Sequence, residues 1–380
     1  MHKFELSVYK GIWEDKNVIT QILQNPDLIR ANHTFWREDF SVDPNITETN
    51  AEGEAVFTSR MRAIDTGVLM DMRAPLGDSI PFEKKGGAAY TATIPDFIAK
   101  GYVETAQERY YKEKMFDQFA DLKNIAVFAT DVLQRGFDSA NQTLSYMSAY
   151  LLSRGELSYL MGQGIQDDLY KPYIKEENYD TAGAKAWTDP TARILDQMKA
   201  KEEKYKELWG VEIPMQWEIE RNQFKECFLP NEQVIEWVRY VNVINNTPLP
   251  ETLVLNEDMV MAAITKFAGI SPIVLVEEKQ KDVYNGIVNG WKENIAVLRP
   301  VGYAGYIRHT TTEDVRLFTD YGNNVNTYSF ASAMNGLATV ANSVIVNGNF
   351  KEWHTDLFMK AVPTLDEFLY HVIVDTTTAD

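Results

Sequence analysis

The chain has 380 residues, of which 45% are hydrophobic, 12% aromatic and 24% charged. These fractions are ordinary for globular proteins, and the length predicts two or three compact units that can each build a core. A net charge of −18 argues against a dedicated nucleic-acid reader, whose binding surface should be basic, but not against a protein that merely encloses nucleic acid. The single cysteine excludes an intrachain disulfide and a cysteine-rich zinc site.

That cysteine, Cys227, lies between Phe224 and Phe228, so we expect a small buried hydrophobe and not a nucleophile. Residues 1–16 carry charges throughout and lack the apolar core of a signal peptide. No run reaches the roughly 18 to 20 apolar residues that a membrane helix requires. We therefore expect a soluble protein that is made in a cytoplasm and does not contact a membrane.

The N-terminal region is irregular and rich in turn residues, and an extended strand is predicted over residues 55–63. Residues 73–106 then stand out, because two extended runs flank the dipeptide Gly86-Gly87, a pattern typical of a long β-hairpin. The return run carries mostly small Ala and Thr side chains, and an isolated two-stranded ribbon is marginal in water. A surface loop is the plain alternative, but we favour an arm that another chain stabilises.

The strongest helical pattern covers residues 105–154. Leu144, Met147 and Leu151 recur at spacings of three and four, which indicates one apolar face. Gly136 could bend this helix or divide it in two. An unbroken helix of about 30 residues would measure about 45 Å, which is long for an ordinary domain and suits a strut.

Beyond this helix, residues 155–185 are mixed, with a plausible strand over residues 171–175. A second helix is predicted over residues 192–208, with Thr188 or Asp189 as its cap and Pro190 in its first turn. Helices and strands then alternate, which indicates an α+β fold. Strands are expected at residues 217–219, 273–276, 296–298, 306–309, 358–363 and 369–374, helices at 224–228, 232–241 and within 253–267, a turn at 301–305 and a mixed stretch at 337–346.

The sequence lacks the common motifs of catalytic sites: it has no P-loop, no HExxH and no G-x-S-x-G. Gly162-Gln163-Gly164 lacks the third glycine of a dinucleotide fingerprint. The acidic pairs Asp167-Asp168 and Glu277-Glu278 could act as acid and base only if burial shifted their pKa values, and solvated faces are the default in so acidic a chain.

Five histidines are scattered singly along the chain, at positions 2, 33, 309, 354 and 371. His309 near Glu313 and Asp314, or His354 near Asp356, could start a metal site, but a histidine beside ordinary acids is the more common reading. We therefore expect no catalytic residue, no cofactor and no metal.

Several stretches, taken in order, resemble a known family. The hairpin tip, Phe82-Glu83-Lys84-Lys85-Gly86-Gly87, is followed by the long helix through Gly136, then by Trp187-Thr188-Asp189-Pro190, the turn from Gly302 to Gly305, and a closing strand through Pro363. This order resembles the HK97-like fold of tailed-phage major capsid proteins, in particular the family of the lambda-type capsid protein E. On this reading the hairpin looks like the E-loop, and residues 82–87 would contact a neighbouring subunit.

The resemblance implies five regions: an N-terminal arm over residues 1–70, the E-loop over 71–108, a peripheral domain with the long spine helix over 109–188, an axial α/β domain over 189–335, and closing strands over 336–380. The chain departs from the family pattern at residues 163–186, which show no obvious paired strands.

By the same resemblance the protein is no enzyme. It would assemble with itself into hexamers and pentamers that form an icosahedral head around double-stranded DNA, with no sequence-specific contact to the DNA. A scaffolding protein, a portal and a decoration protein would be its partners, and the host bacterial cytoplasm its place of assembly before it becomes part of the virion. An encapsulin-like compartment shell is the alternative within the fold, and an acidic soluble hydrolase is the alternative outside it.

Overall fold

The computed structural model divides into two compact units, which are described separately. The first comprises Met1–Phe57, Thr91–Ser148 and Tyr306–Thr364, and the second comprises Thr58–Tyr90, Ala149–Gly305 and Leu365–Asp380. The residues whose structure is described are 32, 34–47, 55–60, 89–94, 96–99, 103–104, 122–161, 164–172, 174–210, 212–245, 255–267, 269–277, 279–282, 286–310, 327–333, 337–347, 350–366 and 368–379.

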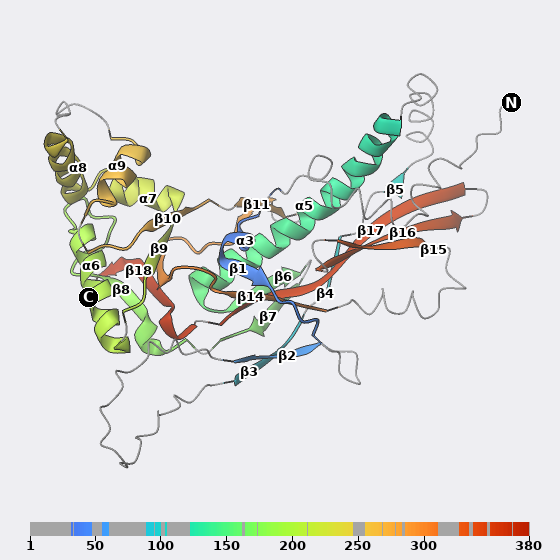
Figure 1. The fold of residues 1–380 in the computed structure, drawn as a ribbon, viewed down its shortest axis with the longest axis horizontal. Coiled ribbons are helices and arrows are strands. Elements are labelled where there is room, and N and C mark those ends of the chain that lie inside the picture. The colour runs from blue at the N-terminus through green and yellow to red at the C-terminus, as the bar shows by residue number, and fades with distance from the viewer. Residues whose placement is uncertain are drawn as a thin grey trace, which may run out of the picture. The chain divides into compact units, whose positions relative to one another are not determined.

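A seven-stranded sheet dominates the first unit, in the order β1-β14-β17-β16-β15, with β4 and β5 also paired to β17. Its strands are β1 (Phe40–Val42), β4 (Asp96–Ala99), β5 (Val103–Glu104), β14 (Gly305–Thr310), β15 (Thr327–Ala333), β16 (Ala338–Asn347) and β17 (Phe350–Leu365). Figure 1 shows β15, β16 and β17 side by side as long arrows. The expected strands at 306–309 and 358–363 are thus confirmed.

The stretch 337–346, expected to be mixed, is instead the regular strand β16. It pairs antiparallel with β17 from Ala338↔Met359 to Asn347↔Phe350. Its small and polar residues give a weak strand signal, and the pairing along its length supplies what local propensity does not.

The expected long helix is α5 (Leu122–Arg154), a single element of 33 residues. It passes through Gly136 without a break, so of the two possibilities left open for Gly136 the division into two helices is wrong. The first part of the predicted helix, residues 105–121, lies outside the described residues. A Cβ on Gly136 would lie 3.4 Å from Leu357 Cδ1, an ordinary van der Waals contact, so the packing of α5 against β17 at this point does not require a glycine. Trp36, on the short helix α3 (Trp36–Asp39), donates from Nε1 to Asn141 Oδ1 of α5 at 3.0 Å.

Two strands frame the segment expected to form the projecting hairpin. The strand predicted at residues 55–63 is β2 (Val56–Arg60), and the return run of the hairpin contains β3 (Ala89–Thr93). These two strands pair with each other as a two-stranded sheet. The outgoing run and the tip, residues 82–87 included, lie outside the described residues, so the hairpin itself remains a prediction.

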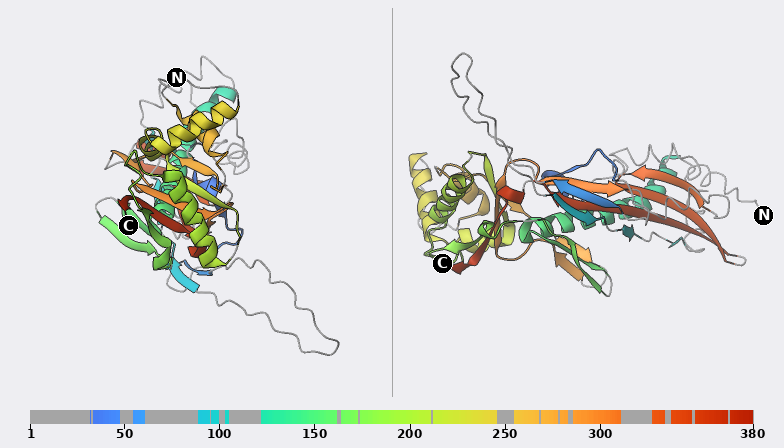
Figure 2. Two further views of the ribbon diagram at one scale, coloured as in Figure 1. Left: turned by 90° about the vertical axis from the view of Figure 1, so that its left-hand side faces the viewer. Right: turned by 90° about the horizontal axis from the view of Figure 1, so that it is seen from below.

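The second unit is built on a five-stranded sheet, in the order β10-β9-β13-β18-β8. The strands are β8 (Tyr179–Gly183), β9 (Met215–Glu220), β10 (Ile273–Val276), β13 (Ile295–Pro300) and β18 (Val372–Ala379), and the helices are α6 (Ile194–Trp209), α7 (Arg221–Phe228), α8 (Glu232–Ile244) and α9 (Glu257–Ile264). Figure 2 gives two further views of these elements. The α+β class and the helices and strands expected between residues 192 and 298 are confirmed.

The connection before α6 was predicted less well. Residues 171–175 are not a strand where they are described; instead β6 (Leu157–Met161) and β7 (Gly164–Tyr170) form an antiparallel hairpin, and β8 pairs in parallel with β18. Gly164 is the first residue of β7 and pairs with Met161, the last residue of β6. The partner of β8 lies almost two hundred residues further along, beyond the reach of local patterns.

Alternation along the strands divides the buried residues of the second unit between two faces of the sheet. Trp217 and Ile219 of β9 point to the face covered by the helices and join its hydrophobic core. Glu218, between them, points to the opposite face, where its neighbour across the ladder is Val297. Both faces are buried at this strand pair, which places a carboxylate inside the protein.

Candidate assembly surfaces

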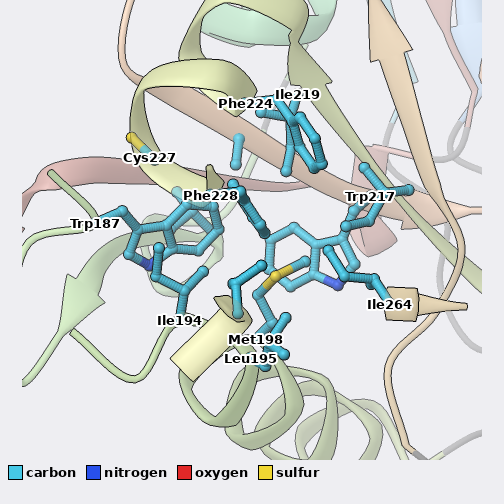
Figure 3. Packing of buried hydrophobic residues seen from close by; sticks show 14 of the residues in the cluster. Trp187, Ile194, Leu195, Met198, Trp217, Ile219, Phe224, Cys227, Phe228 and Ile264 are labelled. Atoms are coloured by element: carbon cyan, nitrogen blue, oxygen red, sulfur yellow. The ribbon is translucent and has the colours of Figure 1, made fainter. Parts of the chain in front are cut away.

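Residues 187–191 lie between β8 and α6 and pack against the helices of the second unit. The Trp187 ring is fully buried, with its centroid 6.0 Å from that of Trp217 and 5.8 Å from that of Phe228 (Figure 3). Asp189 Oδ1 accepts from the backbone N and the Oγ1 of Thr191, both at 2.8 Å. Pro190 O accepts from the backbone N of Glu232, which ties this segment to the start of α8.

The predicted cap of α6 is therefore wrong. The helix begins at Ile194, no side chain caps it from Arg193, and Pro190 precedes its first turn. Asp189 is already used in its own turn. The Oε1 of Gln233, from α8, accepts from the backbone N of Leu195 at 3.0 Å instead, so a neighbouring helix supplies the acceptor.

A buried ion pair holds the opposite face of the sheet. Glu218 and Arg299 side chains are 1% and 2% exposed, and the Glu218 Oε1 lies 2.6 Å from Arg299 Nε and 2.5 Å from Nη2. The remaining arm of the guanidinium, Nη1, donates to the carbonyls of Pro300 and Gly302 at 2.9 and 2.7 Å. One side chain thus connects β9 to the turn that follows β13.

That turn, residues 301–304, presents apolar side chains to solvent. Val301 is 53% exposed and Tyr303 58% exposed. Gly302 between them has φ = +114°, a conformation that other residues rarely adopt, and Gly305 begins β14. The sequence prediction of a turn here is confirmed.

A second exposed apolar group lies at the end of α8. Tyr240, Val243 and Ile244 point outward at spacings of three and four, while Val238 and Val241 of the same helix are buried. The helix is thus apolar on two sides. Such a face on a surface helix is a common mark of a contact with another molecule.

A third exposed apolar side chain, Ile287, lies on the two-stranded ribbon formed by β11 (Lys279–Asp282) and β12 (Gly286–Asn289). The base of this ribbon is tied to β9, because the Nδ2 of Asn289 donates to Glu220 Oε1 at 2.9 Å. Burial raises the pKa of the Glu220 carboxyl, and the hydrogen bond from Asn289 opposes that rise.

In the first unit, β1 is fixed to β14 by polar groups. Arg308 Nη1 forms an ion pair with the carboxylate of Asp43, and His309 Nε2 lies 3.0 Å from the carbonyl O of Asp43. The backbone N of Thr47 donates to the carbonyl of His309 at 2.9 Å. His309 therefore has a structural partner, whereas Glu313 and Asp314, which were considered as partners of His309 in a metal site and discounted, lie outside the described residues.

The buried titratable groups of the second unit have structural partners too. Burial raises the pKa of the Cys227 thiol to about 11, so the thiolate that a nucleophile needs is disfavoured. Asp180 forms an ion pair with Lys201 at 3.2 Å, and Glu202 accepts from Trp217 Nε1 at 2.8 Å. Within the described residues no group of three or more His, Cys, Asp or Glu could hold a metal ion.

The helices in the described part of the chain include none that is long and apolar enough to cross a membrane.

Comparison with known proteins gives results at the level of structure. No protein-family model matches the chain, and no curated protein matches it. A candidate capsid protein of a prophage from Escherichia coli CFT073 superposes with a TM-score of 0.55 at 12% identity, over 95% of this chain and 98% of that one. The chain has an HK97-like capsid fold.

Two further structures are similar over most of their length. A phage-related protein from Bordetella bronchiseptica RB50 has a TM-score of 0.47 at 12% identity, over 93% of this chain and 97% of its own. The mature capsid of bacteriophage PhiM1 has a TM-score of 0.44 at 12% identity, over 90% of this chain and 86% of its own.

The motif residues singled out in the sequence do not form one site but lie in separate parts of the structure. Trp187 lies in the helical core of the second unit, and Gly302 lies in the exposed turn. Pro190 is exposed, and its carbonyl accepts from the backbone N of Glu232 at 2.8 Å. Gly136 lies on α5 against Leu357, while Pro363 is buried in β17 beyond the last pair with β16. A proline is tolerated there because no ladder bond to β16 needs its missing N–H.

The buried ion pair between Glu218 and Arg299 was not predicted from the sequence. Glu218 and Arg299 are 81 positions apart, so no spacing rule could connect them. One signal was available, because Glu218 lies between Trp217 and Ile219 in a predicted strand. When both faces of such a strand are buried, its carboxylate needs a partner.

Proposed function

We propose that this protein is the major capsid protein of a tailed bacteriophage, with a structural and not an enzymatic role. Copies would assemble into hexamers and pentamers that close into an icosahedral head around double-stranded DNA. The observation that carries the proposal is the fold, which follows the candidate prophage capsid protein over 95% of this chain and 98% of that protein.

The surface chemistry supports a shell subunit. Exposed apolar groups occur at three separate places on the second unit: the turn with Val301 and Tyr303, the end of α8, and Ile287. Each is smaller than an ordinary stable interface, which buries about 1,600 Å² in total. A subunit that must meet several neighbours through modest, geometrically fixed contacts needs this kind of distribution.

The five regions implied by the family resemblance are proposed as the domain organisation: arm 1–70, E-loop 71–108, peripheral domain 109–188, axial domain 189–335 and closing strands 336–380. The five-stranded sheet with α6 to α9 supports an axial α/β domain, and the 33-residue α5 supports a spine helix. Some strand pairs join different regions: β8 of the peripheral domain pairs with β18 of the closing strands, and β17 of the closing strands pairs with β4 and β5 of the E-loop region.

For the E-loop we propose that Phe82, Glu83, Lys84, Lys85, Gly86 and Gly87 contact an adjacent subunit. The two lysines would meet acidic groups there, which a chain with 55 acidic and 37 basic residues offers in excess. The double variant Lys84→Glu/Lys85→Glu should therefore assemble less well than wild type, whereas Lys84→Arg/Lys85→Arg should assemble normally. Equal assembly of wild type and both double variants would contradict the proposed charge pairing.

As partners we propose a scaffolding protein, a portal and a decoration protein, besides the chain itself, and the virion as its final location after assembly in the bacterial cytoplasm. The DNA would be enclosed without sequence-specific contacts. No cofactor is proposed.

The test is assembly. The full chain is expressed alone and together with the genes that neighbour it, and the products are analysed by sedimentation and negative-stain electron microscopy. We expect hollow, uniformly sized shells. A product that stays monomeric in both cases would contradict the proposal, and shells that hold a co-purifying enzyme in place of DNA would favour the compartment alternative.

A further inference from the structure

The turn between β13 and β14 combines exposed apolar side chains with a backbone that hydrogen bonds hold in place. Its side chains are exposed and apolar: Val301 and Tyr303 each have more than half of their surface in solvent. Its backbone, however, is bonded at nearly every residue to groups inside the second unit. Scattered exposed apolar side chains are normal, so the backbone bonds need explanation.

The first set of bonds comes from Arg299. Its Nη1 donates to the carbonyls of Pro300 and Gly302, while Nε and Nη2 are both directed at Glu218. A guanidinium has five donors in one plane, and this one divides them between a strand and a turn. A lysine could pair with Glu218 but could not hold two carbonyls at the same time.

The second set comes from the backbone on either side. The N–H of Val301 donates to the carbonyl of Pro214 at 2.9 Å, just before β9. The N–H of Asp366 donates to the carbonyl of Ala304 at 3.1 Å, just after β17. The turn is therefore fixed at both ends and in the middle.

The buried pair is hard to explain by stability alone. Replacing a buried ion pair by apolar side chains of similar volume is often neutral or even stabilising, because desolvation offsets the attraction. The pair does fix positions: Glu218 holds the Arg299 guanidinium, and Arg299 in turn holds the carbonyls of Pro300 and Gly302. A turn held in one conformation loses little freedom when something binds to it.

We propose that residues 300–304 form a preformed contact through which one copy of this chain docks on another copy, with Tyr303 as its anchor. Tyrosine is among the residues that most often dominate binding energy at interfaces. This inference rests on the proposed shell function and names one of its contacts. Glu218 and Arg299 act as positioning residues, because they touch the turn and not the neighbouring copy.

The size of the patch favours a second copy as the occupant. Two side chains cover far less than the roughly 1,000 Å² that a lasting two-protein interface needs. So small a contact becomes useful where it is repeated by symmetry and every copy makes it at once. A chain that presents further apolar groups at α8 and at Ile287 has the additional contacts that such an assembly requires.

The test is site-specific crosslinking in the full chain. Tyr303 is replaced by the photoreactive aromatic residue benzoyl-phenylalanine, assembled particles are irradiated, and the products are mapped by mass spectrometry. We expect crosslinks from position 303 to another copy of the chain, and their loss when the same protein is irradiated below its assembly concentration. The matched control carries the photoreactive residue at Glu203, an exposed position on α6, and should give weaker crosslinks.

The outcomes separate this inference from the proposed function. Three results would overturn the inference and leave the shell proposal intact. Particles could form without crosslinks from position 303, position 203 could crosslink as strongly as position 303, or position 303 could crosslink to a different protein. A wild-type chain that forms no particles with or without its neighbouring genes would overturn both.

Two substitutions measure the size of the contact. Tyr303→Ala should raise the concentration needed for assembly at least about tenfold while leaving the thermal unfolding temperature unchanged, since the side chain points to solvent. Arg299→Lys should raise it as well, even where the protein remains folded by circular dichroism, because the turn loses its two side-chain bonds. Normal assembly of folded Tyr303→Ala would overturn the anchor role.

Discussion

Aromatic side chains are found both in the helical core of the second unit and on its surface, but in very different surroundings. In the core, Trp187, Trp217 and Phe228 are fully buried and meet ring to ring. On the outside, Tyr240 and Tyr303 are more than half exposed. The fold therefore rests on one set of aromatic residues and leaves another set at the surface for the proposed contacts, so a substitution in one set should affect stability and a substitution in the other should not.

The largest effect is expected for Trp187→Ala. It removes a fully buried ring that packs against Trp217 and Phe228, and losses of this kind cost about 3–5 kcal/mol. Urea unfolding followed by tryptophan fluorescence would measure it. The matched control is Val243→Ala on α8, whose side chain is 59% exposed and where we expect a change within about 0.5 kcal/mol. Similar losses in both variants would show that the comparison between core and surface is wrong.

Breaking the buried pair should have a similar or slightly smaller effect. Arg299→Met leaves the Glu218 carboxylate buried without its partner, which costs roughly 3–5 kcal/mol. The double variant Glu218→Leu/Arg299→Met should recover most of that loss, because neither side chain then carries a charge. Chemical denaturation of both single variants and the double variant gives the coupling energy. Additive losses would mean that the two residues act independently.

His371 predicts how the stability of the second unit depends on pH. Its ring is buried, its Nε2 donates to the carbonyl of Leu152 at 2.7 Å, and burial lowers its pKa to about 4 from the usual 6.5. The charges that act on the ring are those of Glu218, which favours protonation, and Arg299, which opposes it. Because the unfolded chain binds the proton more readily, stability is full above pH 6.5 and falls as the pH drops toward 4.

The expected loss is roughly 3 kcal/mol across that window, at about 1.4 kcal/mol for each pKa unit. Unfolding free energies measured between pH 7 and pH 4 would show it. His371→Gln keeps a donor but cannot titrate, so its curve should be flatter by this amount. A variant with the same slope as wild type would assign the acid sensitivity to other groups.

The smallest of the four effects is expected for Gly302→Ala. Nothing lies within 4 Å of the position where its Cβ would be, so the cost comes from the backbone at φ = +114°, about 1–3 kcal/mol. Gly136→Ala is the matched control: it lies inside α5, where alanine is favoured by about 1 kcal/mol, and its Cβ would make ordinary contact with Leu357. Thermal unfolding should therefore separate the two substitutions in sign, and equal destabilisation would contradict this account of Gly302.

Elements with a strong local pattern could be predicted from the sequence. The stripe along α5, the short apolar runs of β10 and β13, and the periodic face of α8 are all set by residues close in the chain. The weaker strands β7 and β8 could not be predicted in this way. Their residues are largely polar or small, and their pairing with β6 and β18 determines their structure.

The candidate surfaces were harder to predict than the fold. Exposure of Tyr240 and Tyr303 depends on which face of an element the core takes, and no residue type reveals that alone. The positioning of the turn by Arg299 depends on Glu218, a partner far away in sequence. The resemblance to a capsid fold implied a contact at residues 82–87, which stays a prediction, and it did not name the residues that hold this turn.

The most direct test of the central claim is a cryo-electron microscopy reconstruction of particles formed by this chain, at a resolution that places individual subunits. We predict a closed shell of repeated subunits in which residues 300–304 touch a neighbouring copy and the segment 73–106 lies across an adjacent subunit. Particles in which both regions face only solvent would contradict the assigned contacts, and a chain that remains monomeric at every concentration and with its neighbouring gene products would contradict the account as a whole.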